Sequence, residues 1–268
     1  MDNRPIGFFD SGLGGLTCIP FLHQKLPNEK IIYYGDTART PYGSKSIENI
    51  RQFSTQIVDY LVSHDVKLIV IACNTVSATC IDLLKERFPE VPILGIIDPM
   101  ARKIAEIGES KDKFGVIGTK VTISSGVYED KVKMYNESIN IHSLACPALV
   151  PLIEEGIINN EIMDLMIKYY IDDFQKKRNI NKLVLGCTHY PIIQENIQRL
   201  YPDMELLNPS EEVINSVGKM LEEKGMLAEP NDSRNLCYAS DLSENFLNMI
   251  NLFFDNDSVD TDIMKFYD

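Results

Sequence analysis

The chain alternates along its whole length between short apolar runs rich in β-branched residues and longer amphipathic stretches. A short apolar run that ends in polar residues predicts a strand, and apolar positions three or four residues apart predict a helix. Strands are predicted at residues 6–9, 31–34, 68–72, 93–97, 114–118, 139–144, 183–186, 205–207 and 236–239, and helices between most of them, including 47–63, 77–87, 161–175 and 211–224. This alternation predicts an α/β fold with mostly parallel sheets and helices on their faces.

Two proline-marked dipeptides interrupt the alternation, Asp98-Pro99 and Asn208-Pro209. Proline disfavours helical geometry in the residue before it, so we expect the chain to cross between two α/β units at these points. The two halves also resemble each other in a faint way, because each contains a strand followed by Cys, Thr and a helix. The sequence therefore predicts two pseudo-symmetric domains, one made of residues 1–97 plus 208–268 and the other of residues 98–207.

Composition limits the functional classes. The 268 residues are 44% hydrophobic and 9% aromatic, as in ordinary globular proteins, and the net charge of −13 argues against nucleic acid as a partner. An anionic small molecule is still compatible, because main-chain N–H groups can bind it locally. The acidic stretch 255–262 is predicted to be a solvated tail or loop. We find no run typical of a membrane span or a signal peptide, so the six cysteines are expected to be reduced thiols of a cytoplasmic protein.

Two cysteines follow predicted strands directly. Cys73 ends one apolar run and precedes Asn74-Thr75, and Cys187 ends another and precedes Thr188-His189. Ligands bind at the carboxyl edge of parallel sheets. A thiol near a helix N-terminus is expected to have a lowered pKa. Two such thiols in matching halves of the chain predict a pair of acid/base groups that face one substrate.

Cysteine is also a common core residue, and that interpretation suits Cys18, Cys80, Cys146 and Cys237. Cys73 and Cys187 differ from these four, because side chains with hydroxyl, amide or imidazole groups directly follow each of them. The tight spacing in Cys187-Thr188-His189 does not fit a structural zinc site, and the sequence has no Cys-x-x-Cys pair, so no metal is expected.

Other strand ends carry further candidate groups. Asp10 precedes a glycine-rich turn whose spacing is not that of a dinucleotide-binding loop. As a carboxylate beside a reacting centre it would accept a proton or orient an ammonium group, although a helix cap is an alternative. Tyr42-Gly43 lies in a loop that either presents main-chain donors or is only a turn. Thr119 and Thr122 offer hydroxyl groups that also suit helix caps.

These motifs, taken together and in order, resemble those of bacterial glutamate racemases, which belong to the cofactor-independent aspartate/glutamate racemase superfamily. The shared motifs are Asp10-Ser11-Gly12 with Gly14-Gly15, Pro41-Tyr42-Gly43, Ala72-Cys73-Asn74-Thr75, Gly118-Thr119 with Thr122, and Leu185-Gly186-Cys187-Thr188-His189-Tyr190-Pro191. The resemblance runs from about residue 5 to about residue 240. The last thirty or so residues carry no motif of this kind.

The resemblance implies two α/β domains with the active site in the cleft between them. It implies that Cys187 takes the α-proton from L-glutamate and Cys73 takes it from D-glutamate, without a cofactor or metal. Asp10 and His189 match residues that assist these two thiols, and Glu154 matches a further carboxylate. The positions that match substrate contacts are Asp10, Ser11, Tyr42, Gly43, Asn74, Thr75, Thr119, Thr122, Thr188 and His189. The implied role is supply of D-glutamate for peptidoglycan, by a cytoplasmic homodimer.

Two alternatives stay open. An aspartate racemase would use the same bases on a shorter substrate, but the aspartate enzymes typically have Glu at the position of His189. A thiol redox sensor would pair Cys73 with Cys187 in a disulfide on mild oxidation and would turn over no amino acid.

Overall fold

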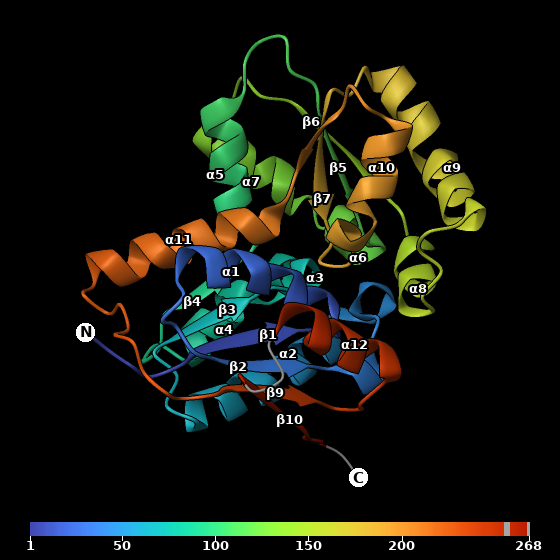
Figure 1. Ribbon diagram of the computed structural model, residues 1–268. Coiled ribbons are helices and arrows are strands. Elements are labelled where there is room, and N and C mark those ends of the chain that lie inside the picture. Colours follow the sequence, from blue (N-terminus) through green and yellow to red (C-terminus); the bar gives the residue numbers. More distant parts are fainter. Residues whose placement is uncertain (255–257, 267–268) are drawn as a thin grey trace.

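The computed structural model describes residues 1–254 and 258–266, and in them the strands form two parallel sheets (Figure 1). The first sheet has the order β10-β9-β2-β1-β3-β4 and the second the order β6-β5-β7-β8. The strands of the first sheet are β1 (Ile6–Asp10), β2 (Ile31–Gly35), β3 (Leu68–Ile71), β4 (Ile93–Gly95), β9 (Asn235–Ala239) and β10 (Val259–Ile263), and those of the second are β5 (Phe114–Gly118), β6 (Ile141–Ala145), β7 (Lys182–Gly186) and β8 (Glu205–Leu207). The predicted fold class is confirmed.

Helices cover both faces of the two sheets. They are α1 (Ile19–Lys25), α2 (Ile47–Ser63), α3 (Asn74–Thr79), α4 (Ile81–Arg87), α5 (Ile97–Ile107), α6 (Lys120–Ser124), α7 (Val127–Tyr135), α8 (Leu149–Glu154), α9 (Glu161–Arg178), α10 (Gln194–Leu200), α11 (Pro209–Glu223) and α12 (Glu244–Phe253), with short 3-10 turns η1 (Gly14–Cys18), η2 (Thr37–Arg39), η3 (Tyr42–Ser44) and η4 (Tyr190–Ile193). Within the described residues, none of the helices combines the length and the apolar character needed to span a bilayer.

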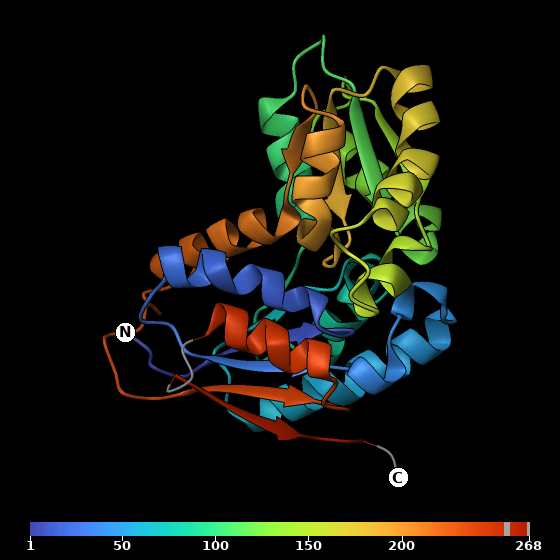
Figure 2. The ribbon, with the colours of Figure 1, turned by 45° about the vertical axis from the view of Figure 1, so that its right-hand side comes forward.

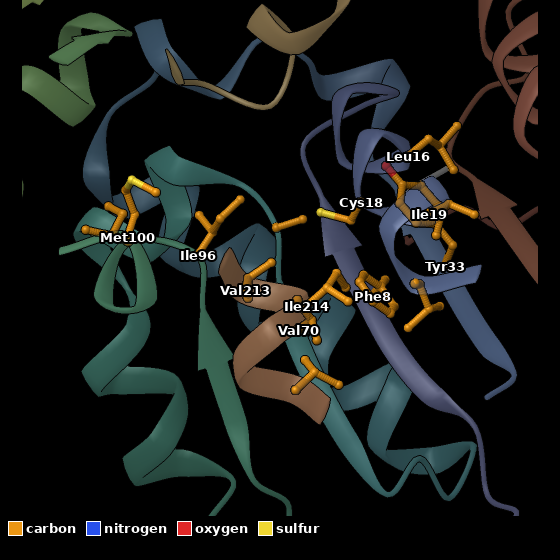
Figure 3. Close-up of a cluster of buried hydrophobic side chains, with 14 of the residues drawn as sticks. Phe8, Leu16, Cys18, Ile19, Tyr33, Val70, Ile96, Met100, Val213 and Ile214 are labelled. Carbon is orange, nitrogen blue, oxygen red and sulfur yellow. The ribbon is translucent and has the colours of Figure 1, made fainter. Parts of the chain in front are cut away.

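The central strands are apolar over almost their whole length because helices cover both faces of the sheet. Every residue of β1 and β3 is buried. Figure 3 shows how distant segments build this core: Val213 and Ile214 of α11 lie beside Phe8 of β1 and Val70 of β3. The chain therefore returns to the first sheet after it has built the second. The cysteines assigned to the core are all buried, as predicted: Cys18, Cys80, Cys146 and Cys237.

The chain passes from the first sheet to the second between β4 and β5, and returns between β8 and β9. At the return, Asn208 has an extended backbone, and its side chain caps α11 by accepting a hydrogen bond from the N–H of Ser210. Asp98 and Pro99 lie on the first of these connections, but the extended geometry expected at Asp98 is wrong, because both residues lie in the first turn of α5, where proline costs no hydrogen bond. The exact domain boundaries stay a prediction.

Three element predictions need correction. The helix predicted at 77–87 is two helices, α3 and α4, because the backbone at Cys80 leaves helical geometry. The strand predicted at 93–97 ends at Gly95. In the acidic stretch 255–262, residues 255–257 lie outside the described residues, but β10 (Val259–Ile263) is a strand that pairs in parallel with β9. Its position at the sheet edge explains why acidic residues are compatible with a strand there.

Candidate active site

The predicted site residues come together where the carboxyl ends of the two sheets face each other. Asp10 ends β1 and Cys73 follows β3 in the first sheet, whereas Thr119 follows β5 and Cys187 follows β7 in the second. The hydroxyl group of Thr188 donates a hydrogen bond of 3.1 Å to Asp10 across this boundary. The turns that carry the two cysteines therefore belong to one site.

Cys73 lies at the N-cap of α3 in a closed environment. Its side chain is buried, and the thiol lies 3.5 Å from Oγ of Ser11, to which it donates. Burial and then the negative charge of Asp10 raise the pKa of Cys73 to about 12. The expected lowering of this pKa is wrong, because desolvation of a thiolate outweighs the few N–H groups of a six-residue helix. Cys73 is thus held as a thiol.

Cys187 has a different environment, built from a histidine and a carboxylate. Its Sγ atom lies 3.8 Å from Nδ1 of His189, and Nε2 of that ring lies 2.5 Å from Oε1 of Glu154. Burial lowers the pKa of His189, but the contacts with Cys187 and Glu154 outweigh it and leave the pKa well above its usual value. An imidazolium is therefore favoured beside Cys187. The segment after Cys187 is a turn and the 3-10 helix η4, not the α-helix that was expected.

The two thiols lie near enough to influence each other, since negative charge on Cys187 raises the pKa of Cys73. Both are buried, and all six cysteines are free. The two thiols are thus close together but differ in their surroundings: Cys73 is buried beside a carboxylate, and Cys187 faces a histidine that favours the cationic form.

Asp10 is completely buried at the centre of the site. One oxygen accepts from the N–H of Gly12 at 3.1 Å and the other from Thr188. Burial raises the pKa of Asp10, and His189 and these donors oppose the rise. Gly15 is required here, because a Cβ atom at that position would lie 2.6 Å from Cβ of Asp10.

Hydroxyl groups that follow β3 of the first sheet and β5 of the second form a cluster across the boundary between the sheets. Oγ1 of Thr75 lies 3.0 Å from Oγ1 of Thr119 and 3.3 Å from Oγ1 of Thr122. The loop that carries Gly43 packs on the same cluster, and a Cβ atom at Gly43 would lie 2.4 Å from Cβ of Thr119. The hydroxyl of Tyr42 donates to Asp36, so this side chain fixes its own loop.

Sequence reasoning missed Tyr128 of α7, whose hydroxyl group donates a hydrogen bond of 2.6 Å to Oδ1 of Asn74. That contact leaves Nδ2 of Asn74 buried and without a hydrogen-bond partner in the described residues. A buried, unpaired amide donor of this kind is suited to an anionic ligand oxygen. Nothing in the local sequence distinguishes Tyr128 from a core residue, because its partner lies on the other half of the molecule.

Comparisons with known proteins identify the family of the chain. The sequence profile of the Asp/Glu/hydantoin racemase family matches residues 18–217. A glutamate racemase from Chlorobaculum tepidum is 37% identical over 264 residues, which cover 98% of this chain and 96% of the relative, and one from Geobacter metallireducens is 38% identical over 93% of this chain and 92% of the relative. The match thus extends past the span expected from the motifs.

Solved structures give the same result. The crystal structure of glutamate racemase from Francisella tularensis subsp. tularensis in complex with D-glutamate has a TM-score of 0.90 and 36% identity, covering 100% of this chain and 98% of that one. A glutamate racemase isoform from Bacillus anthracis has a TM-score of 0.91 and 31% identity, covering 99% of each chain.

Proposed function

Because the chain belongs to the Asp/Glu/hydantoin racemase family, we propose that it interconverts L-glutamate and D-glutamate with Cys73 and Cys187 as two opposed bases. The observation that carries the proposal is the pair of buried thiols at the meeting edges of the two sheets, each in its own electrostatic environment. The relatives named glutamate racemase, and the similar structure solved with D-glutamate, support the choice of substrate.

In the direction from L-glutamate, Cys187 begins as a thiolate beside the His189 imidazolium and takes the α-proton. The Cα–H bond breaks as the S–H bond of Cys187 forms. Cys73 then gives its thiol proton to the opposite face of the carbon, and its S–H bond breaks as the new Cα–H bond forms. The two thiols end with exchanged protonation states, and the reverse reaction uses them in the opposite roles. The raised pKa of Cys73 suits its role as the acid in the first direction.

Removal of the α-proton develops negative charge on the substrate carboxylate. Preorganised donors that are already desolvated stabilise such charge most effectively. The unpaired Nδ2 of Asn74 and the hydroxyl group of Thr75 belong to residues that directly follow Cys73, and Thr188 directly follows Cys187. Asp10 is buried among these groups and would pair with the substrate ammonium group.

The proposed setting is the bacterial cytoplasm, where six free thiols stay reduced and D-glutamate is used for peptidoglycan. The proposal keeps the division into residues 1–97 plus 208–268 and residues 98–207, with the site between the two parts, and a homodimer as the assembly.

A circular-dichroism assay started from each enantiomer of glutamate tests the proposal. We expect both reactions to reach the same racemic end point, with or without a chelator. C73A and C187A should each lose racemisation in both directions, because each thiol is a base one way and an acid the other. Turnover of aspartate alone would favour the aspartate racemase, and a Cys73–Cys187 disulfide with no turnover would favour the redox sensor.

A further inference from the structure

The helix α12, near the end of the chain, reaches the boundary between the two sheets, where it lies below α8 in both ribbon views (Figures 1 and 2). It follows β9 of the first sheet, whereas α8 follows β6 of the second. A hydrogen bond joins the two helices: Nδ2 of Asn245 donates to the main-chain oxygen of Glu154 at 2.5 Å. This contact connects the first sheet's part of the molecule to a residue that faces His189.

The start of α12 is firmly anchored on the first sheet. The side chain of Ser243 caps the helix by accepting from the N–H of Phe246 at 3.1 Å. Phe246 is fully buried, and its ring centroid lies 6.2 Å from that of Tyr33 in β2. Asn245 lies between the cap and this anchor, so its backbone position is fixed by the first sheet.

Glu154 is the last residue of α8, and the last carbonyl groups of a helix have no partner inside the helix. Asn245 supplies a partner for this one. The carboxylate of the same residue contacts Nε2 of His189 through Oε1. The main chain and the side chain of Glu154 thus have separate contacts, and the main-chain contact comes from the part of the molecule that carries the first sheet.

We infer that Asn245 is a positioning residue: by holding the main chain of Glu154, it keeps that carboxylate on His189 while the two sheets are closed on each other. The inference rests on the proposed function, in which His189 assists Cys187. Opening of the boundary would break the Asn245 contact and release the end of α8. The hydrogen-bonded chain from Glu154 through His189 to Cys187 would then lose its alignment, so the base would be complete only in the closed arrangement.

The kinetic test compares N245A with N248A, which makes the same change at an exposed position on the same helix. We expect N245A to lower kcat by roughly tenfold, the effect of losing one hydrogen bond that orients a reacting group. KM should stay within about twofold, because Asn245 does not contact substrate in this account. N245Q, which keeps the amide donor, should recover part of the loss. Because enantiomers have equal free energy, kcat/KM must fall by the same factor in both directions.

A second measurement separates positioning from simple helix capping. NMR titration of the imidazole of His189 in the substrate-free protein reports on its surroundings, in which Glu154, Cys187 and the charge of Asp10 face the ring. We expect the titration midpoint to be lower in N245A than in the wild type and unchanged in N248A. An unchanged His189 titration in N245A, or equal kcat in N245A and N248A, would overturn the inference. If the wild-type protein does not racemise glutamate, the proposed function fails, but the titration still decides the role of Asn245.

Discussion

Nε2 of His189 lies 2.5 Å from Oε1 of Glu154, and the ring that joins this carboxylate to Cys187 is almost completely buried. A cation in such a position is costly unless it is paired, and the contact with Glu154 provides the pairing. The contact between His189 and Glu154 is therefore expected to affect the stability of the fold as well as catalysis.

The first prediction concerns the pH dependence of unfolding. The folded-state pKa of His189 is raised, so its contribution to stability is full below the unfolded value of about 6.5 and is lost as the pH rises through the folded value. Urea unfolding should show a decrease in the free energy of unfolding between about pH 6.5 and pH 8, by at most about 1.4 kcal/mol per pH unit. H189N should remove this decrease.

His142 provides the matched control, because burial lowers its pKa and the sign is reversed. H142N should therefore leave the decrease above pH 6.5 in place. A wild-type stability that rises over the same interval would contradict the assignment of His189 as a cation.

The second prediction concerns Asp10, whose carboxylate is buried at a cost in stability. Its raised pKa means that stability is lost as the pH rises from the unfolded value through the folded one. Asparagine can accept from the N–H of Gly12 and donate to the hydroxyl group of Thr188, so D10N keeps both contacts.

We therefore expect D10N to raise Tm at pH 7 by a few degrees, since 1 kcal/mol corresponds to about 2–4 °C in a chain of this size. The gain should shrink towards pH 5. Activity should fall by about a hundredfold yet stay measurable, because both thiols remain. A lower Tm for D10N at pH 7 would show that the charged form stabilises the fold.

The third prediction tests the close approach of the two sheets. In G43A, the added Cβ atom would lie 2.4 Å from Cβ of Thr119, so the Tyr42–Ser44 turn and the start of α6 must separate. We expect kcat/KM to fall by about tenfold to a hundredfold, because small displacements of reacting groups are costly. G218A is the control, since its nearest neighbour, Leu26, is 3.6 Å away. Equal activity of the two variants would contradict a closed site.

The fourth prediction is a preference for glutamate over aspartate, expected from the His189 that follows Cys187-Thr188. A missing methylene alone is worth about 1–3 kcal/mol, and unpaired binding groups add to this cost. We expect kcat/KM for glutamate to exceed that for aspartate by at least about a hundredfold. Comparable values for the two substrates would reject the assignment.

The sequence predicted the parts of this site that depend on local rules. Cys73 and Cys187 could be placed at strand ends because an apolar run that stops at a polar turn can be recognised from the local sequence alone. The raised pKa of Cys73 could not be predicted, because it depends on burial and on Asp10, which only tertiary structure brings near. Tyr128 and Asn245 were missed for a similar reason, since each contacts a residue on the opposite half of the molecule.

The prediction of a solvated tail or loop for the acidic segment near the C-terminus failed for a different reason. Its charges argued for a solvated loop, yet an edge strand needs a neighbour on only one side and tolerates charged residues. The pairing of β10 with β9 therefore depends on the tertiary structure, and the composition of the segment does not reveal it.

The central claim is that separate thiols remove and deliver the α-proton, and racemisation of L-glutamate in deuterated water tests it most directly. Mass spectrometry of each enantiomer at early times should find solvent deuterium at the α-carbon of the D-glutamate product, while the remaining L-glutamate still carries protium. Product that keeps the original α-proton, or substrate that gains deuterium as fast as product, would contradict the two-thiol account.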